Sequence, residues 1–367
     1  MSPIKFACNF ARIFGLLNSE DRPWGLILTV YHVFMLIWGL FGPLIFAVLK
    51  SDNLTEMFQG LSLVFGYIHL TGKVINILAQ EKKIRKLLGR LEIVRLETME
   101  NDEAETFILR ADKFLIKFNI IYSTLIVSFP FTSATLNFID NYKTEFKNLH
   151  LAFPIWIPWN INEFWKYLGG LICQVLVLVT GNGYYGSFVA LQFTFAFQIS
   201  GFLKALQHHL ETYGPNSKTI YQQHANIIGL IKEYNSIFSG QMYLEILVSP
   251  VQPCGFGYAL IKALSRNDQS AFSLIPITMV TVTTSFTVCY SGQEVHTQME
   301  NLHASAYMNS WYEEKPKVRR DLLQMMILTK NPTVFNYRRW VHFDYVTFST
   351  VMQGVYTYLS MMAHFAN

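Results

Sequence analysis

The feature that most constrains this chain is a series of long apolar runs separated by charged stretches. Only 15% of the 367 residues are Asp, Glu, Lys or Arg, against about 25% in a soluble domain. A helix needs roughly 20 apolar residues to cross a bilayer core, and several runs reach about that length. The runs do not alternate with period two, which argues against a barrel. We predict an all-α, polytopic membrane protein with seven transmembrane helices, at 24–49, 54–79, 114–139, 167–202, 238–264, 271–290 and 343–365.

The Lys and Arg residues between these runs predict the orientation of the chain. The N-terminal segment and the connections 80–113, 203–237 and 291–342 hold 21 of them, and the other connections hold 5. Because basic residues next to spans stay cytoplasmic, we expect a cytoplasmic N-terminus and an extracellular C-terminus. This orientation is the reverse of a G-protein-coupled receptor. The sequon that begins at Asn53 falls in a predicted outer connection, so Asn53 is a candidate glycosylation site.

The remaining features exclude several classes of function. The four cysteines have no paired spacing that would indicate disulfides or a zinc site. His208, His209 and His224 fit no metal-binding template, and we expect them on a solvated or interfacial cytoplasmic helix. No phosphate-binding glycine loop or nucleophile elbow stands out, so we predict no enzyme and no cofactor, and the basic loops do not indicate a nucleic-acid surface. Lys5 and Arg12 interrupt the apolar N-terminal segment, which indicates a retained amphipathic segment rather than a signal peptide.

A few charged and kinking residues lie inside the expected spans. Glu245 is the acid of the fifth span, and we expect it to pair with another span or with the headgroup region. Lys73 and Lys117 lie near the predicted cytoplasmic ends of their helices, where their ammonium groups can snorkel toward water. Pro250 and Pro253 predict a kink in the fifth span, since proline cannot donate a helical hydrogen bond.

The last expected span carries polar side chains at helical spacing. Steps of three and four residues place them on one face of the helix. The residues are Gln353, Thr357, Met361 and His364, with Phe365 beside the last. A polar face toward lipid is costly, so this face should meet water or protein. Two interpretations stay open: the face lines an aqueous pore, or it packs against other helices, with Gly354 and Ser360 allowing close approach.

A set of residues from the connection 291–342 into the last span forms a recognisable signature. The residues are Ser291, Gly292, Val295, Leu302, Ala306, Tyr307, Trp311, Tyr312, Arg320, Leu322, Leu323, Phe348, Tyr356 and Tyr358. This set resembles the C-terminal signature of insect odorant receptors, and the aromatic stretch FPIWIPWN before the fourth span agrees with that family. The resemblance implies an odour-specific subunit of a ligand-gated, non-selective cation channel. It also implies a heterotetramer with the odorant-receptor co-receptor, in the plasma membrane of olfactory sensory neurons.

The resemblance further implies how the chain is divided. Residues 1–290 would form the first six membrane helices with the ligand pocket, 291–342 a cytoplasmic anchor between subunits, and 343–367 the pore-lining last helix. Met361 and Phe365 would contribute to a hydrophobic gate, and His364 would line the pore just outside it.

A pocket for a small volatile ligand should be apolar with few polar groups. The resemblance implies that it lies within one subunit, in the outer halves of the second, third, fourth and sixth spans. The orientation predicted above then selects the candidate lining residues. They are Phe58, Leu61, Phe65, His69, Phe131, Thr132, Thr135, Phe138, Leu178, Val179, Tyr184, Tyr185, Ile277, Thr278, Thr281 and Val282.

Three other functions stay open. The C-terminus also resembles the gustatory-receptor signature, because Thr357-Tyr358 is followed by five residues and His364-Phe365, with His in place of Gln. That resemblance would imply a homotetrameric ligand-gated channel. A metabotropic seven-helix receptor would need the opposite orientation, and a transporter is disfavoured because no internal repeat is visible.

Overall fold

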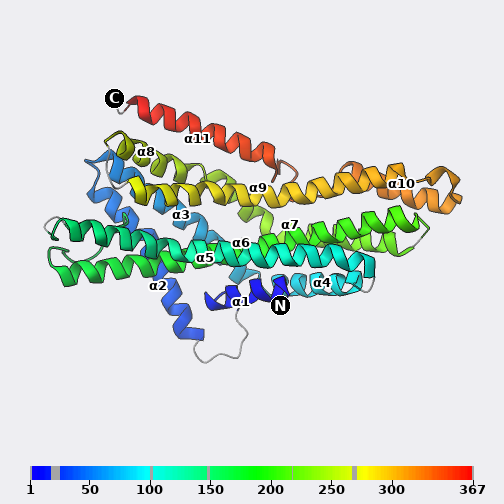
Figure 1. The fold of residues 1–367 in the computed structure, drawn as a ribbon, viewed down its shortest axis with the longest axis horizontal. Coiled ribbons are helices and arrows are strands. Elements are labelled where there is room, and N and C mark those ends of the chain that lie inside the picture. Colours follow the sequence, from blue (N-terminus) through cyan, green and yellow to red (C-terminus); the bar gives the residue numbers. More distant parts are fainter. Residues whose placement is uncertain are drawn as a thin grey trace.

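The computed structural model describes residues 2–17, 25–99, 102–146, 149–216, 218–266 and 271–365. In these ranges the chain is almost entirely helical (Figure 1), which confirms the all-α prediction. The helices are α1 (Pro3–Ile13), α2 (Gly25–Leu49), α3 (Leu54–Ala79), α4 (Glu81–Met99), α5 (Asp102–Lys143), α6 (Phe164–Tyr213), α7 (Lys218–Val248), α8 (Val251–Ser265), α9 (Ala271–Met308), α10 (Pro316–Lys330) and α11 (Tyr345–Phe365). A short antiparallel hairpin, β1 (Asn336–Tyr337) with β2 (Val341–His342), precedes α11.

Six segments of the described chain are long and apolar enough to cross a membrane. They are Val30–Leu49, Leu54–Ala79, Glu103–Lys143, Phe164–Tyr213, Lys218–Ser265 and Leu274–Met308. These segments contain most or all of the first six predicted spans, so the chain is a multi-pass membrane protein. The seventh predicted span forms α11, whose Gln, Thr, Ser and Tyr side chains lower its hydropathy. A seventh crossing therefore stays a prediction.

The fifth predicted span is built from two helices rather than one. α7 ends at Val248, and α8 begins at Val251 directly after Pro250. Proline has no backbone N–H and its ring collides with the preceding turn, so the break falls where the sequence places the prolines. The predicted kink is confirmed, and it lets α8 diverge from α7 along the bundle (Figure 1).

Several helices, above all α5, α6, α7 and α9, are longer than a bilayer requires. The 50 residues of α6 extend about 75 Å at 1.5 Å per residue, against a hydrocarbon core of about 30 Å. Much of the connections 80–113, 203–237 and 291–342 is therefore helical, and α4 and α10 lie at the far end of the molecule from the last residues of α11 (Figure 1). Hydropathy alone did not reveal this extension, because charged amphipathic helices such as α4 contain no membrane-length apolar run.

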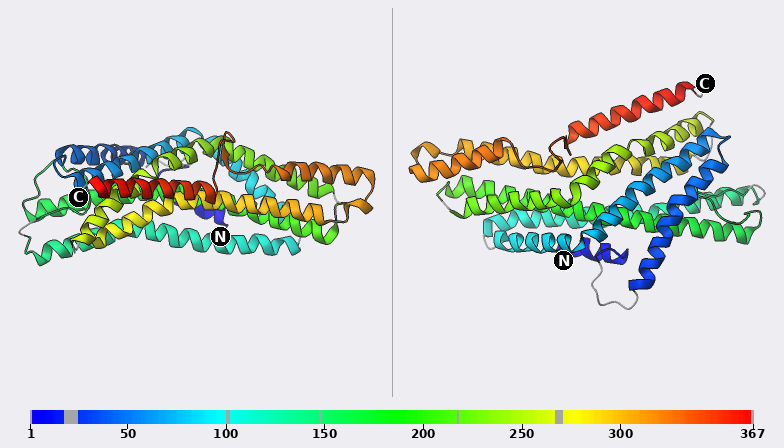
Figure 2. Two further views of the ribbon diagram at one scale, coloured as in Figure 1. Left: turned by 90° about the horizontal axis from the view of Figure 1, so that it is seen from above. Right: turned by 180° about the vertical axis from the view of Figure 1, so that it is seen from behind.

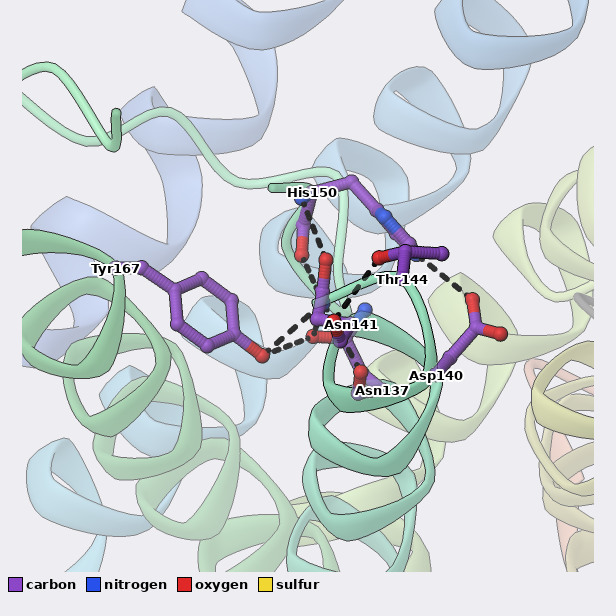
Figure 3. Close-up of polar contacts among 6 residues, drawn as sticks. All are labelled: Asn137, Asp140, Asn141, Thr144, His150 and Tyr167. Atoms are coloured by element: carbon purple, nitrogen blue, oxygen red, sulfur yellow. Dashed lines mark hydrogen bonds and ion pairs between the residues drawn. The ribbon is translucent and has the colours of Figure 1, made fainter. Parts of the chain in front are cut away.

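The opposite end of the bundle carries the aromatic segment 149–163, which polar contacts fasten to α5 and α6. Asn141 lies at the centre of these contacts (Figure 3): its side-chain N–H group donates to the His150 carbonyl at 3.0 Å, and its oxygen accepts from the His150 N–H at 3.2 Å. Gln174 binds the Phe153 N–H and carbonyl at 3.1 and 2.8 Å. This segment covers a cavity of 590 Å³ that Lys50, Lys262 and other residues line. We call it the outer cavity because it lies at this end of the bundle.

The last helix, α11, lies along one edge of the bundle (Figures 1 and 2). It packs against α8 and α9, as shown by the edge-to-face rings of Phe286 and Phe348, whose centroids are 5.4 Å apart. Val351 and Val355 are buried on its inner face. The opposite face of α11, called its outer face below, carries the exposed side chains of Gln353 and Thr357.

Candidate functional site

A small central cavity of 90 Å³ lies between α3, α6, α8 and α9. Its lining is mostly apolar, with a few hydroxyl, amide and imidazole groups, which is the composition expected for an odorant site. The residues are Leu63, Gly66, Tyr67, His69, Leu70, Leu178, Gly181, Asn182, Tyr185, Gln252, Val280 and Thr281. Four of the predicted pocket residues, His69, Leu178, Tyr185 and Thr281, thus meet here from three different helices.

Close approach of the helices keeps this cavity small. A Cβ atom on Gly66 would collide with the Gln252 side chain, and one on Gly255 would collide with Ser62. A Cβ on Gly255 would also lie 2.8 Å from the Phe58 backbone oxygen, which cannot rotate away, so the close packing of α8 on α3 requires glycine at this position. On the other side of the cavity, the Tyr67 hydroxyl donates to the Val177 carbonyl at 3.0 Å and joins α3 to α6.

A buried ion pair adjoins the cavity through Tyr185. Lys73 Nζ lies 2.7 Å from Glu245 Oε2, and the two side chains are 1% and 0% exposed. The Tyr185 hydroxyl donates to Glu245 Oε1 at 3.1 Å, and the Lys73 ammonium lies 4.1 Å from the centroid of the Tyr185 ring. Three helices, α3, α6 and α7, thus meet at one charged cluster, which connects the cavity wall to the centre of the bundle.

The Lys73–Glu245 pair tests two predictions from the sequence, one for each residue. Glu245 was expected to pair with another span or the headgroup region, and its partner is Lys73 of α3. Lys73 was expected to snorkel, and this prediction is wrong, because Glu245 and the rings of Tyr185 and Phe188 hold its ammonium inside the protein. The signal was an acid inside one span and lysines inside others, since such charges are costly in lipid unless they meet. Lys117 was a second candidate, so the sequence did not name the partner.

Other predicted pocket residues lie in two crevices on the flank of the bundle. One, of 400 Å³ between α5 and α6, is lined by Phe131, Thr135, Phe138 and Val179 among others. The second, of 330 Å³ between α5 and α9, includes Thr132. The hydroxyls of Thr132 and Thr135 donate to carbonyls of their own helix, at 3.1 and 2.8 Å. Their hydroxyl protons are therefore not directed at the crevices.

The rest of the predicted pocket residues line none of these four spaces. They are Phe58, Leu61, Phe65, Tyr184, Ile277, Thr278 and Val282. Phe58 packs edge-to-face on Tyr258, with centroids 6.1 Å apart, and Tyr184 packs on His32 at 5.2 Å. Ile277 is buried, and the Thr278 hydroxyl donates to the Leu274 carbonyl at 2.8 Å. Phe65 is 36% exposed on the surface of α3. Helical spacing could not distinguish such positions from cavity positions, because it does not identify the neighbouring helix.

The predicted pore residues share the outer face of α11. Gln353, Thr357, Met361 and His364 are all exposed on the described chain, and Met361 is 48% exposed. Phe365 ends the helix, and its side chain lies outside the described residues. The pore-lining role of this face stays a prediction.

Asn53, His208 and His209 have local partners, whereas the buried Nε2 atom of His224 has no hydrogen-bond partner in the described part of the chain. Asn53 caps α3, because its side-chain oxygen accepts from the Thr55 N–H at 3.2 Å, and its N–H group donates to Glu56 at 2.9 Å. His208 lies 3.2 Å from Glu103, the ring of His209 packs on Tyr213, and His224 is buried. Glycosylation of Asn53 stays a prediction.

Comparisons with known proteins agree along the whole chain. A family model described as "7tm Odorant receptor" matches residues 53–356. Odorant receptor 94a of Drosophila melanogaster is 20% identical over 86% of this chain and 83% of its own length, and odorant receptor 85c of the same fly is 22% identical over 99% and 98%.

Solved structures show the same fold. The insect olfactory receptor OR5 from Machilis hrabei superposes with a TM-score of 0.75 at 12% identity, over 98% of this chain and 97% of that receptor. The same receptor in complex with eugenol gives a TM-score of 0.72 at 15% identity, with the same coverage. The match of the family model to most of the chain establishes that this protein belongs to the insect odorant receptor family.

Proposed function

We propose that this chain is the odorant-binding subunit of a heteromeric, ligand-gated, non-selective cation channel. Its partner would be the odorant-receptor co-receptor, in the plasma membrane of olfactory sensory neurons, with the N-terminus inside and the C-terminus outside. The lysine and arginine distribution described above supports this orientation. The likeness to a receptor that forms a complex with eugenol supports a small, largely apolar ligand.

One observation carries the link from ligand to channel: two helices that line the central cavity, α8 and α9, are also the helices on which α11 packs. A Cβ added to Gly257 of α8 would lie 3.3 Å from Leu359, and Phe286 of α9 packs on Phe348. A ligand that favours a different spacing of α8 and α9 would therefore displace α11. Only a difference in ligand affinity between the two arrangements can drive this change.

On the outer face of α11, a row of exposed polar and apolar side chains would line the shared ion path. Apolar side chains at a constriction can close a pore by dewetting, and polar neighbours can stabilise ions. Met361 would contribute to the gate, His364 would lie just outside it, and Gln353 and Thr357 would line the pore below. Residues 1–290 would then contain the pocket, 291–342 the anchor between subunits, and 343–367 the pore helix. The first boundary falls within a helix, because α9 runs unbroken across residue 290.

Filling the central cavity should block activation. Thr281 is buried at the cavity wall, and Thr281→Phe would place a ring where the ligand packs. Overpacking costs about 1–3 kcal/mol, so we expect the half-maximal odorant concentration to rise by about tenfold or more. The measurement is whole-cell current from cells that co-express the co-receptor, tested with a panel of volatile alcohols, esters and phenols.

Ile275→Phe is the matched control, because Ile275 lies on the same helix, is exposed and lines none of the four spaces. It should leave the response unchanged. An unaltered response of Thr281→Phe, at equal surface expression, would show that the ligand binds elsewhere.

The gustatory-type alternative is tested by expressing the chain alone. Robust odorant-gated current without the co-receptor would favour a homotetramer. A C-terminal epitope that antibodies reach on intact cells would exclude the metabotropic receptor, which needs its C-terminus in the cytoplasm.

A further inference from the structure

The crevice between α5 and α9 lies directly beside the central cavity. It measures 330 Å³, and its wall is mainly hydrocarbon. The hydroxyls of Ser128 and Thr283 donate to carbonyls of their own helices, at 3.1 and 2.7 Å. Leu125 and Met279 are 63% and 65% exposed at its edge. The crevice therefore presents an apolar opening on the flank of two membrane-spanning helices.

The partition between the crevice and the cavity is one side chain thick. Val280 lines both spaces. The Asn182 side chain, which lines the cavity, donates at 3.0 Å to the carbonyl of Ile126, which lines the crevice. The shared Val280 and this hydrogen bond thus place the two spaces back to back.

The volumes show why this juxtaposition matters. A cavity of 90 Å³ is smaller than the roughly 150 Å³ cavity that holds benzene in an engineered protein. An odorant-sized molecule therefore cannot occupy the central cavity unless part of the wall moves. Displacing Val280 would join the cavity to the 330 Å³ crevice, and the joined space reaches the range of about 300–1,000 Å³ that is usual for ligand pockets.

The outer cavity offers a poorer route. It is larger, at 590 Å³, but its lining includes the charged side chains of Lys50, Glu56, Lys262 and Arg266. It shares no lining residue with the central cavity. A molecule that partitions into hydrocarbon would concentrate at the α5–α9 crevice and not at this charged opening.

We propose that the α5–α9 crevice is the entrance through which a small, uncharged, apolar ligand passes from the bilayer to the central cavity, with Val280 as the side chain that must be displaced. This inference rests on the proposed function, since it takes the central cavity as the ligand site. Valine in a helix has essentially one rotamer, so access requires a shift of α9 against α5 rather than rotation of the side chain. Pro276 weakens α9 at the crevice, because proline removes one helical hydrogen bond.

The experiment measures how fast an apolar probe reaches the cavity. The receptor, assembled with the co-receptor in lipid nanodiscs, is mixed with 3-trifluoromethyl-3-phenyldiazirine and photolysed after increasing delays. Mass spectrometry then quantifies labelling of Leu178 and Tyr185 themselves, because both line the cavity, whereas Val179 between them lines the α5–α6 crevice. Thr283→Trp narrows the crevice at an exposed position that does not line the cavity. Gln59→Trp is the matched control in the outer cavity.

We expect Thr283→Trp to slow labelling by about tenfold or more, as a narrowed gate limits access, and to leave its final extent unchanged. Gln59→Trp should match the wild type, and Val280→Ala, which thins the partition, should label faster. Equal rates in the wild type, Thr283→Trp and Val280→Ala would overturn the proposed entrance, as would slowing by Gln59→Trp alone. If Thr283→Trp does not assemble, the labelling rate of Val280→Ala is compared with that of the wild type: a faster rate supports the entrance, and an equal rate overturns it. Absence of labelling at Leu178 and Tyr185 even at long delays would instead contradict the central cavity as the ligand site.

Discussion

Lys73→Met is expected to remove most of the folded receptor from the cell surface. The substitution preserves much of the side-chain length but leaves the Glu245 carboxylate, which is 0% exposed, without its cation. Breaking a buried ion pair by removing one partner costs about 3–5 kcal/mol, which is a large part of the stability of a typical domain. The amount at the surface is measured by antibody labelling of intact cells. The stability is measured by heating a fluorescent fusion protein in detergent and quantifying the folded peak by size-exclusion chromatography.

Lys166→Met provides the matched control, because Lys166 pairs with Glu163 at 2.7 Å while both side chains are at least half exposed. Exposed pairs contribute about 0–1 kcal/mol, so this variant should melt close to the wild type. Combining Lys73→Met with Glu245→Gln removes both charges and keeps an acceptor for the Tyr185 hydroxyl. We expect the double variant to recover much of the loss. Equal melting of Lys73→Met and Lys166→Met would show that the buried pair does not stabilise the fold.

Gly292→Ala is expected to abolish odorant-gated current. A Cβ atom at this position would collide with the carbonyl oxygen of Phe343 and would lie 2.9 Å from its carbonyl carbon. Backbone atoms cannot rotate away as a flexible side chain can, so the segment that leads into α11 must move. Phe343 is itself buried, and its N–H donates to the Phe335 carbonyl at 3.2 Å. Overpacking of this kind costs about 1–3 kcal/mol, occasionally more, and here it displaces the start of the proposed pore helix.

Gly89→Ala is the control for Gly292→Ala, because Gly89 lies within α4 and an added Cβ meets nothing within 4 Å. Alanine in place of a helical glycine should stabilise by about 0.5–1 kcal/mol. Current recordings and melting temperatures of the two variants separate a local backbone collision from a general effect of the added methyl group. Normal current from Gly292→Ala would show that the approach of α9 to residue 343 is not required.

The Ser291-Gly292 pair also shows how a sequence signature acquires a physical meaning. Gln192 of α6 donates to the Ser291 hydroxyl at 2.7 Å, and Gly292 admits the backbone of Phe343. The two adjacent residues of α9 therefore contact α6 on one side and the segment before α11 on the other. The resemblance identified these positions, but only the fold shows that they connect α6 and α9 to the segment before the last helix.

The membrane helices could be predicted because their signal is local. Runs of apolar residues and kinking prolines specify length and breaks without any knowledge of neighbours, and the α7–α8 break after Val248 follows that rule. The Lys73–Glu245 pair could not be assigned in advance, because its members lie on helices far apart in the sequence. Each charge, taken alone, could have turned toward the headgroups.

The residues that line the central cavity were predicted less completely, for a related reason. Helical periodicity gives the direction of a side chain relative to its own helix, but not the identity of the helix that it meets. Tyr184 and Tyr185 are neighbours in the sequence, yet Tyr184 packs on His32 while Tyr185 lines the cavity. The contribution of α8 to the cavity, through Gln252, was missed, because the four spans implied by the resemblance did not include it.

The central claim, that the outer face of α11 borders the ion path, is tested most directly by cysteine accessibility. Met361→Cys is expressed with the co-receptor, and a membrane-impermeant, positively charged methanethiosulfonate is applied from outside while odorant holds the channel open. We expect rapid, irreversible block with Met361→Cys, and no more than the wild-type change with Val355→Cys, which is buried on the opposite face. Block by Val355→Cys, with Met361→Cys unreactive in the open channel, would contradict the assignment.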